Sequence, residues 1–84
     1  MLTLTSKDNS NIKNTVKLKK STRYRRRSGL FIAEGLRVCY DAMLSNAEIE
    51  ILFATEKAIE KNRDKFMKLS DYSRKTFVVT EQIF

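Results

Sequence analysis

The stretch GLFIAEG at residues 29–35 decides how this chain is expected to fold. Its four apolar residues, 30–33, are bounded by a glycine on one side and a Glu-Gly pair on the other. A short apolar run between turn residues is typical of a buried strand. The apolar residues at 36–44 are too dense for a surface helix, so we predict a largely buried helix there, ended by a Ser-Asn pair.

The same alternation of strand and helix patterns continues downstream. The predicted elements are, in order, a strand at 49–54, a surface helix at 56–69 capped by Thr55, a strand at 76–80 and the start of a helix capped by Thr80. Strands and helices that alternate with short connections are typical of a parallel sheet built from right-handed crossovers. We therefore expect an α/β fold, a small mixed or parallel sheet flanked by helices, with residues 30–84 as its body.

A strongly basic segment precedes this body. Residues 1–29 hold nine Lys and Arg side chains against the single acid Asp8, whereas residues 30–84 hold eight basic and nine acidic side chains. A helix is predicted over residues 10–20 with Asn9 as its cap. All of the excess charge thus lies in a basic helix and loop, residues 1–29, of the same domain as the body.

The basic segment combines cations with an aromatic ring. If the helix continues past residue 20, one stripe contains Lys13, Lys17, Lys20, Tyr24 and Arg27. Basic side chains neutralise phosphates and a tyrosine can stack on an unpaired base, which is the usual combination for irregular RNA. A solvated helix face is the alternative, but such a face would mix both charge signs. The RNA-binding candidates therefore also include the neighbouring Arg23 and Arg25.

The composition excludes several kinds of chemistry. The chain has no histidine and one cysteine, Cys39, so neither an internal disulfide nor a zinc site is expected. We expect no catalytic residue and no cofactor or metal in these 84 residues. The first residues are too few and too polar for a signal peptide, and no apolar run is long enough to cross a membrane. A cytoplasmic location is expected.

Four short patterns together resemble a known family. They are TSxxNxxIK at residues 5–13, YR at 24–25, GLFIAEGxR at 29–37 and the predicted strand at 49–55. Over essentially all 84 residues the chain resembles the N-terminal substrate-binding domain of the SpoU/TrmH RNA 2′-O-ribose methyltransferases. The resemblance implies a fold like that of the kink-turn-binding ribosomal proteins. It also implies a separate, knotted catalytic domain that binds S-adenosylmethionine.

Carried over position by position, the resemblance implies RNA contact by Asn9, Lys13, Arg25, Glu34 and Arg37. The sequence departs from the family pattern at residue 10, where serine stands in place of the usual first-turn proline. The family domain also continues beyond position 84 into a last strand, followed by the catalytic domain. A sheet without that strand would have an uncovered edge, so we expect self-association, with the last two residues exposed or docked on a neighbouring copy.

The function expected from these observations is recognition of ribosomal or transfer RNA for a 2′-O-ribose methyltransferase that uses S-adenosylmethionine. Two alternatives stay open. The chain could be a stand-alone RNA- or ribosome-binding protein, or a protein-interaction module whose basic helix meets an acidic partner. Glu34 likewise has two structural alternatives to RNA contact, a local ion pair with Arg37 or an interaction with the dipole at the start of the following helix.

Overall fold

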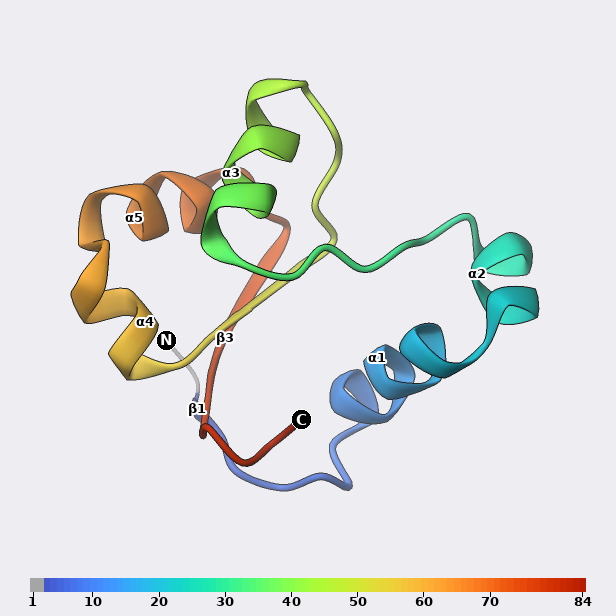
Figure 1. Ribbon diagram of the computed structural model, residues 1–84. Helices are drawn as coiled ribbons and strands as arrows, with labels where there is room; N and C mark the ends of the chain where they lie inside the picture. Colours follow the sequence, from blue (N-terminus) through green and yellow to red (C-terminus); the bar gives the residue numbers. More distant parts are fainter. Residues whose placement is uncertain (1–2) are drawn as a thin grey trace.

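A three-stranded parallel sheet forms the centre of the computed structural model, which describes residues 3–84. The strands are β1 (Thr3–Leu4), β2 (Ile51–Ala54) and β3 (Lys75–Val79), in the order β1-β3-β2. Phe53 of β2 is paired with Phe77 of β3, and their rings stack at 5.9 Å between centroids. Figure 1 shows β3 beside the short N-terminal strand. The predicted α/β class with a small parallel sheet is confirmed, although β1 was not predicted.

The first face of the sheet is covered by α1 (Ser10–Lys20) and by the end of the chain. Here the buried core consists of Leu4, Ile12, Val79 and Ile83. α1 was predicted with these bounds, and its cap is confirmed, because the Asn9 side chain accepts hydrogen bonds from the backbone N–H groups of the first turn.

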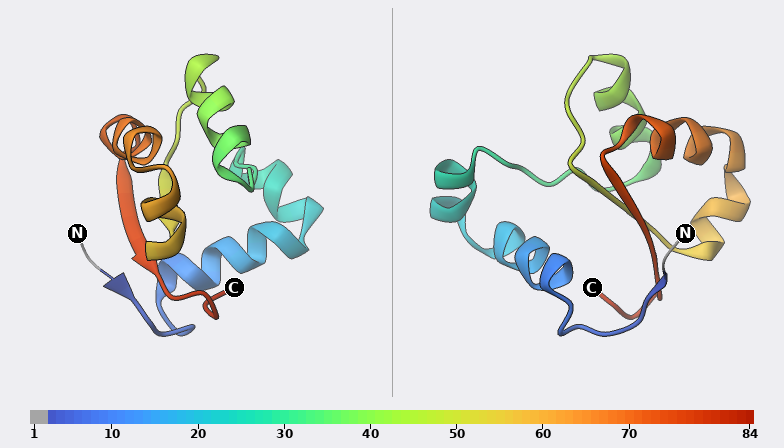
Figure 2. Two further views of the ribbon diagram at one scale, coloured as in Figure 1. Left: turned by 60° about the vertical axis from the view of Figure 1, so that its left-hand side comes forward. Right: turned by 180° about the vertical axis from the view of Figure 1, so that it is seen from behind.

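The second face is covered by α3 (Leu36–Leu44) and α5 (Arg63–Tyr72). Its core contains Leu52, Phe66 and Leu69, with one side of α3 packed against them. Successive β2 residues therefore point to opposite faces, as the pleat of a strand requires. Figure 2 shows α1 and α5 on opposite sides of the strands. The prediction that α3 is largely buried was wrong, since none of its residues is buried and Leu44 is 64% exposed.

The predicted strand at residues 30–33 is absent. The segment runs in an open conformation from α2 (Thr22–Ser28) to α3, as Figure 1 shows, and Phe31 is 71% exposed. A cavity lies between this segment and the chain from Ala47 to Phe53. Because that space separates the segment from β2, no ladder of backbone hydrogen bonds forms between them.

Three other predictions differ from the structure toward the C-terminus. The helix expected at 56–69 is divided into α4 (Glu56–Lys61) and α5, because Asn62 has φ −146° and ψ 61°, outside the helical region. The Thr55 cap of α4 is as predicted. The helix expected after Thr80 is a turn instead, and Ile83 is only 3% exposed within this chain's own core, so the prediction that it is exposed or docked on another copy was wrong.

Candidate nucleic-acid interface

The basic segment forms two helices that meet at Ser21. α1 ends at Lys20, Ser21 is extended with φ −121° and ψ 110°, and α2 begins at Thr22. The Ser21 hydroxyl accepts a hydrogen bond from the Tyr24 N–H at 3.0 Å, which caps α2. The predicted stripe from Lys13 to Arg27 on one continuous helix is therefore corrected to a surface with a bend in the middle.

Arg25 fixes this bend. Its guanidinium donates hydrogen bonds to the Leu18 carbonyl at 2.5 Å and the Lys19 carbonyl at 3.0 Å, both in the last turn of α1. It also donates to the Thr22 hydroxyl at 3.0 Å. The last carbonyls of a helix have no partner inside the helix, so a cation that reaches back to them satisfies these groups and favours the helix dipole. Three of the donors that Arg25 could offer to RNA are thus engaged within the chain.

Tyr24 also bridges the two helices. Its hydroxyl donates a hydrogen bond to the Asn14 side-chain oxygen, and the Lys17 ammonium lies 4.5 Å from the centre of its ring. The ring is partly buried. One face of Tyr24 is therefore already covered by a cation, which reduces the area available for stacking on a base.

The remaining cations of α1 and α2 face solvent. No acidic residue occurs between residues 9 and 33, so the two helices have no carboxylate of their own to balance them. Among residues 3–84, the one ion pair formed by this segment joins the Lys19 ammonium to Glu34 at 2.8 Å. The exposed cations of the two helices, in addition to this lysine, are Lys13, Lys17, Lys20, Arg23, Arg26 and Arg27. Such an excess of one sign is the electrostatic footprint of a polyanion-binding surface.

The residues singled out by the family resemblance occupy three places. Asn9 caps α1, where its side chain is engaged with the backbone, and Lys13 is exposed one turn later. Arg37 is exposed in the first turn of α3. The predicted alternative pair between Glu34 and Arg37 is not formed, since the Glu34 carboxylate contacts Lys19 instead. Contact of these residues with RNA stays a prediction.

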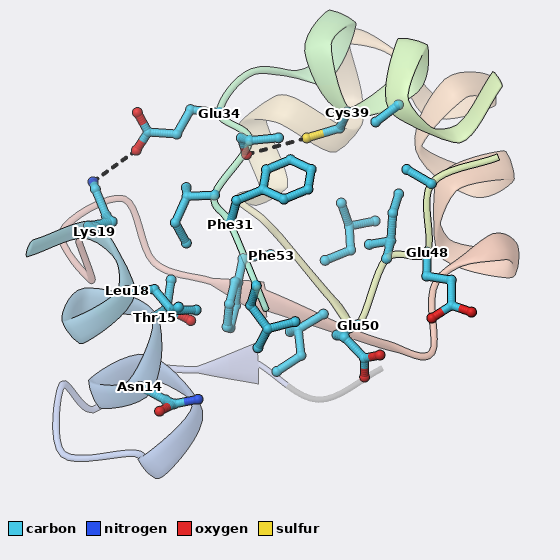
Figure 3. Close-up of a pocket in the computed structure, with 18 of the residues that line it drawn as sticks. Asn14, Thr15, Leu18, Lys19, Phe31, Glu34, Cys39, Glu48, Glu50 and Phe53 are labelled. Carbon is cyan, nitrogen blue, oxygen red and sulfur yellow. Dashed lines mark hydrogen bonds and ion pairs between the residues drawn. The ribbon is translucent and has the colours of Figure 1, made fainter. Parts of the chain in front are cut away.

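A cavity of about 620 Å3 lies between α1, the segment 29–35 and the start of β2. Its walls include the apolar side chains of Leu18, Phe31 and Phe53, and Figure 3 shows these around the cavity with the Lys19–Glu34 pair at its edge. A second hollow of about 350 Å3 adjoins it, lined by Lys19, Arg25, Phe31, Ile32 and Glu34. Phe31 thus lies in the wall of both hollows.

Phe31 was missed as a candidate because its apolar neighbours in the sequence indicated a buried strand. A signal was present in its position, four residues after the Arg25-Arg26-Arg27 run, since aromatic residues among cations are typical of nucleic-acid surfaces. The sequence pattern alone could not show that the ring is exposed. The structure shows it beside the basic helices and open to solvent.

The two glycines of this region serve the backbone. Gly29 ends α2 with φ 71° and Gly35 precedes α3 with φ 99°, conformations that residues with a side chain rarely adopt. A Cβ atom added at either glycine would meet no atom within 4 Å. No neighbouring protein atom therefore requires either position to lack a side chain, and the backbone conformation accounts for both glycines.

Cys39 is partly buried in α3. Burial raises the pKa of the Cys39 thiol, which donates a weak hydrogen bond to the Ala33 carbonyl at 3.6 Å. Within residues 3–84 no three potential metal ligands come together. No helix in that part of the chain is long and apolar enough to span a membrane.

One family of known proteins matches this chain. Residues 9–84 match the family model described as the MRM3-like substrate binding domain. No curated protein and no solved structure matches the chain. The family match spans both basic helices, the segment 29–35 and strands β2 and β3. The chain therefore belongs to the family of MRM3-like substrate-binding domains.

Proposed function

We propose that this chain holds structured RNA, either ribosomal or transfer RNA, for a 2′-O-ribose methyltransferase that uses S-adenosylmethionine. The observation that carries the proposal is the exposed, unbalanced positive charge of α1 and α2 in a domain whose family binds substrates. RNA is the polyanion that such methyltransferases modify, and backbone phosphates are the groups that Lys and Arg neutralise.

The arginines of α2 are arranged to contact phosphates side by side. Arg23, Arg26 and Arg27 are spaced by three and four residues, so they lie on neighbouring positions of one helix surface. Each guanidinium can offer two parallel N–H donors to phosphate oxygens. Because Arg25 holds α2 against the end of α1, the three guanidinium groups of α2 keep a fixed position relative to the lysines of α1.

The glycine content supports a separate site for S-adenosylmethionine. A nucleotide cofactor is usually cradled by a glycine-rich loop that allows close backbone approach, whereas this chain has two glycines, Gly29 and Gly35, six residues apart. We therefore assign the cofactor and the methyl transfer to the methyltransferase, and substrate recognition to this chain. Calorimetry with S-adenosylmethionine should detect no binding to residues 1–84, and micromolar binding would contradict this division.

RNA binding is tested by fluorescence anisotropy with a labelled hairpin RNA, with heparin and an acidic peptide as competitors. We expect binding that weakens linearly as the logarithm of the salt concentration rises. The unlabelled hairpin should compete better than heparin of equal charge. If heparin and the acidic peptide compete equally well, the domain is a general polyanion binder or a protein-interaction module, and the proposal fails.

The link to methylation needs a second experiment. RNA crosslinked to this chain in cells should contain a 2′-O-methylated nucleotide close to the crosslink, because the domain places substrate for the methyltransferase. The matched control is a chain with Arg23, Arg26 and Arg27 replaced by alanine, which should recover less of the same RNA. If the crosslinked RNA carries no 2′-O-methyl group, RNA recognition could stand but its assignment to ribose methylation would not.

A further inference from the structure

Phe31 is the most exposed of the large apolar side chains in residues 3–84, at 71%. It lies in the segment between α2 and α3, which makes no strand pairing. An exposed aromatic side chain is unremarkable when it stands alone among polar groups. Phe31 stands in the wall of two adjoining hollows, and its apolar neighbours there are Leu18, Ile32 and Phe53. The ring is therefore part of a concave apolar surface that is open on one side.

Cations border this surface on the side of the basic helices. Lys19 and Arg25 line the smaller hollow together with Phe31, where Lys19 is paired with Glu34 and Arg25 is bonded to α1. The free positive charge comes from Arg26 and Arg27, which are exposed in the last turn of α2, a few residues before Phe31. An RNA strand whose phosphates rest on α2 would carry its next bases toward this ring. The positive charge favours a polyanion as the ligand of this surface. The aromatic ring favours a polyanion with bases that can stack on it.

The other aromatic residue of the basic surface is less suited to this task. Lys17 covers one face of the Tyr24 ring, and the Tyr24 hydroxyl is bonded to Asn14. The ring of Phe31 has no polar group to satisfy, and Figure 3 shows it projecting into the larger cavity. Unlike the Tyr24 ring, the Phe31 ring thus has a free face.

We propose that Phe31 is a stacking platform for an unpaired base of the bound RNA, and that the hollow beside Lys19 and Arg25 receives that nucleotide. The proposal rests on the proposed function, because it assumes that RNA is the ligand of the basic surface. A base inside a duplex cannot reach the ring, so the site selects RNA with a loop, a bulge or a free end. Stacking is tolerant of base identity, since every base has a π-face.

The test compares variants of the full 84-residue chain on two RNAs, a hairpin with an all-uridine loop and a fully paired duplex of the same length. We expect Phe31→Ala and Phe31→Leu to weaken hairpin binding by about 5- to 150-fold, the range for loss of one stacked base. Phe31→Trp should keep the wild-type affinity. The leucine variant retains apolar volume without a π-face, so it separates stacking from simple apolar contact and from loss of folding.

Four further results are expected if the proposal is right. The slope of log affinity against log salt should be unchanged in the Phe31 variants, because no charge is lost. Duplex binding should be unaffected. The matched control Leu44→Ala, which removes an exposed apolar side chain from the far end of α3, should bind both RNAs as the wild type does. With 5-iodouridine in the loop, long-wavelength irradiation should join the RNA to the peptide that contains Phe31.

The outcomes separate this site from the proposed function. If the wild-type chain binds the hairpin with a salt-dependent affinity but Phe31→Leu binds equally well, the stacking site is overturned and RNA recognition stands. A crosslink at Tyr24 with none at Phe31 would also overturn it. If the wild type binds neither RNA, the proposed function fails and the stacking site fails with it.

Discussion

At the scale of single residues, Arg25 shows how a side chain of a basic run can serve the fold before it serves a ligand. Three of its hydrogen bonds end on α1 or on the first residue of α2, so its contribution to a binding surface is chiefly to hold the two helices at a fixed angle. Its neighbours Arg26 and Arg27 are exposed and have no such bonds within residues 3–84. The three arginines of this run therefore have two different roles.

We expect Arg25→Ala to lower the free energy of unfolding by about 1–2 kcal/mol, because hydrogen bonds from a charged donor are lost and the carbonyls of α1 must be solvated again. Arg27→Ala, which removes the same charge from an exposed position, should change stability by no more than about 0.5 kcal/mol. Urea denaturation followed by circular dichroism measures both. Equal stability of the two variants would show that the bend does not depend on Arg25.

Cys39 offers a test of the second core. Burial raises the pKa of its thiol, and the thiolate is the reactive form, so at a slightly alkaline pH the folded chain holds less thiolate than a free cysteine does. Ellman's reagent should therefore react with the native chain more slowly than with a cysteine-containing peptide. In urea the two rates should become equal. A native rate that matches the peptide would mean that Cys39 does not pack against the second core as the structure shows.

At the scale of helices and strands, the sequence predicted the elements whose signals are local. The Asn9 cap predicted where α1 begins, and the absence of acidic residues predicted its positive charge. The Thr55 cap predicted where α4 begins. The break at Asn62 could not be predicted, because asparagine is only mildly unfavourable in a helix and packing decides the angle between α4 and α5. The two-residue strand β1 is defined by its partner β3, which the sequence does not reveal.

The segment 30–33 shows the limit of hydrophobic pattern as a guide. Its four apolar residues match the pattern of a buried strand, but the pattern does not show whether a partner strand lies beside them. In the structure β3 is the middle strand, with β1 and β2 on either side, and a cavity separates the segment from β2. Because the segment does not pair with β2, Phe31 is exposed. The sequence could therefore predict the charged residues of the candidate site but not its exposed aromatic ring.

The charges of α2 should account for a definite share of the salt dependence of RNA binding. Replacement of Arg23, Arg26 and Arg27 by alanine should flatten the slope of log affinity against log salt by about two units, since each phosphate contact on single-stranded RNA contributes about 0.7. The control replaces three exposed lysines of α4 and α5, Lys57, Lys61 and Lys68, which removes the same charge from the other side of the sheet. Equal slopes for the two triple variants would move the interface away from α2.

At the scale of the whole molecule, the sheet separates two cores. Leu4, Ile12, Val79 and Ile83 hold α1 and the residues after β3 to one face, while α3 and α5 cover the other. The basic surface is therefore attached to the body through the first core. Its position depends on a few buried side chains from segments that are far apart in the sequence.

Ile83 is the member of this core nearest the end of the chain, and it is 3% exposed. We expect Ile83→Ala to lower the free energy of unfolding by about 2–4 kcal/mol, because a buried isoleucine leaves a cavity when it is truncated. Gln82→Ala, at an exposed position beside it, is the matched control. Thermal melting distinguishes the two, and an unchanged melting temperature in Ile83→Ala would show that the chain end does not belong to the core in solution.

Self-association through an uncovered sheet edge stays a prediction, and sedimentation of the same samples tests it.

The claim at the centre of this account is that RNA binds to α1, α2 and the segment 29–35, on the same side of the sheet. The most direct measurement is a titration of the isotopically labelled 84-residue chain with a hairpin RNA, followed by amide chemical shifts in solution NMR. We predict that the chemical-shift changes concentrate in residues 9–35, with the largest changes in α2 and around Phe31. The amide chemical shifts of α4 and α5 should not change. Shifts centred on α4 and α5, or no shifts at RNA concentrations that saturate the anisotropy signal, would contradict the account.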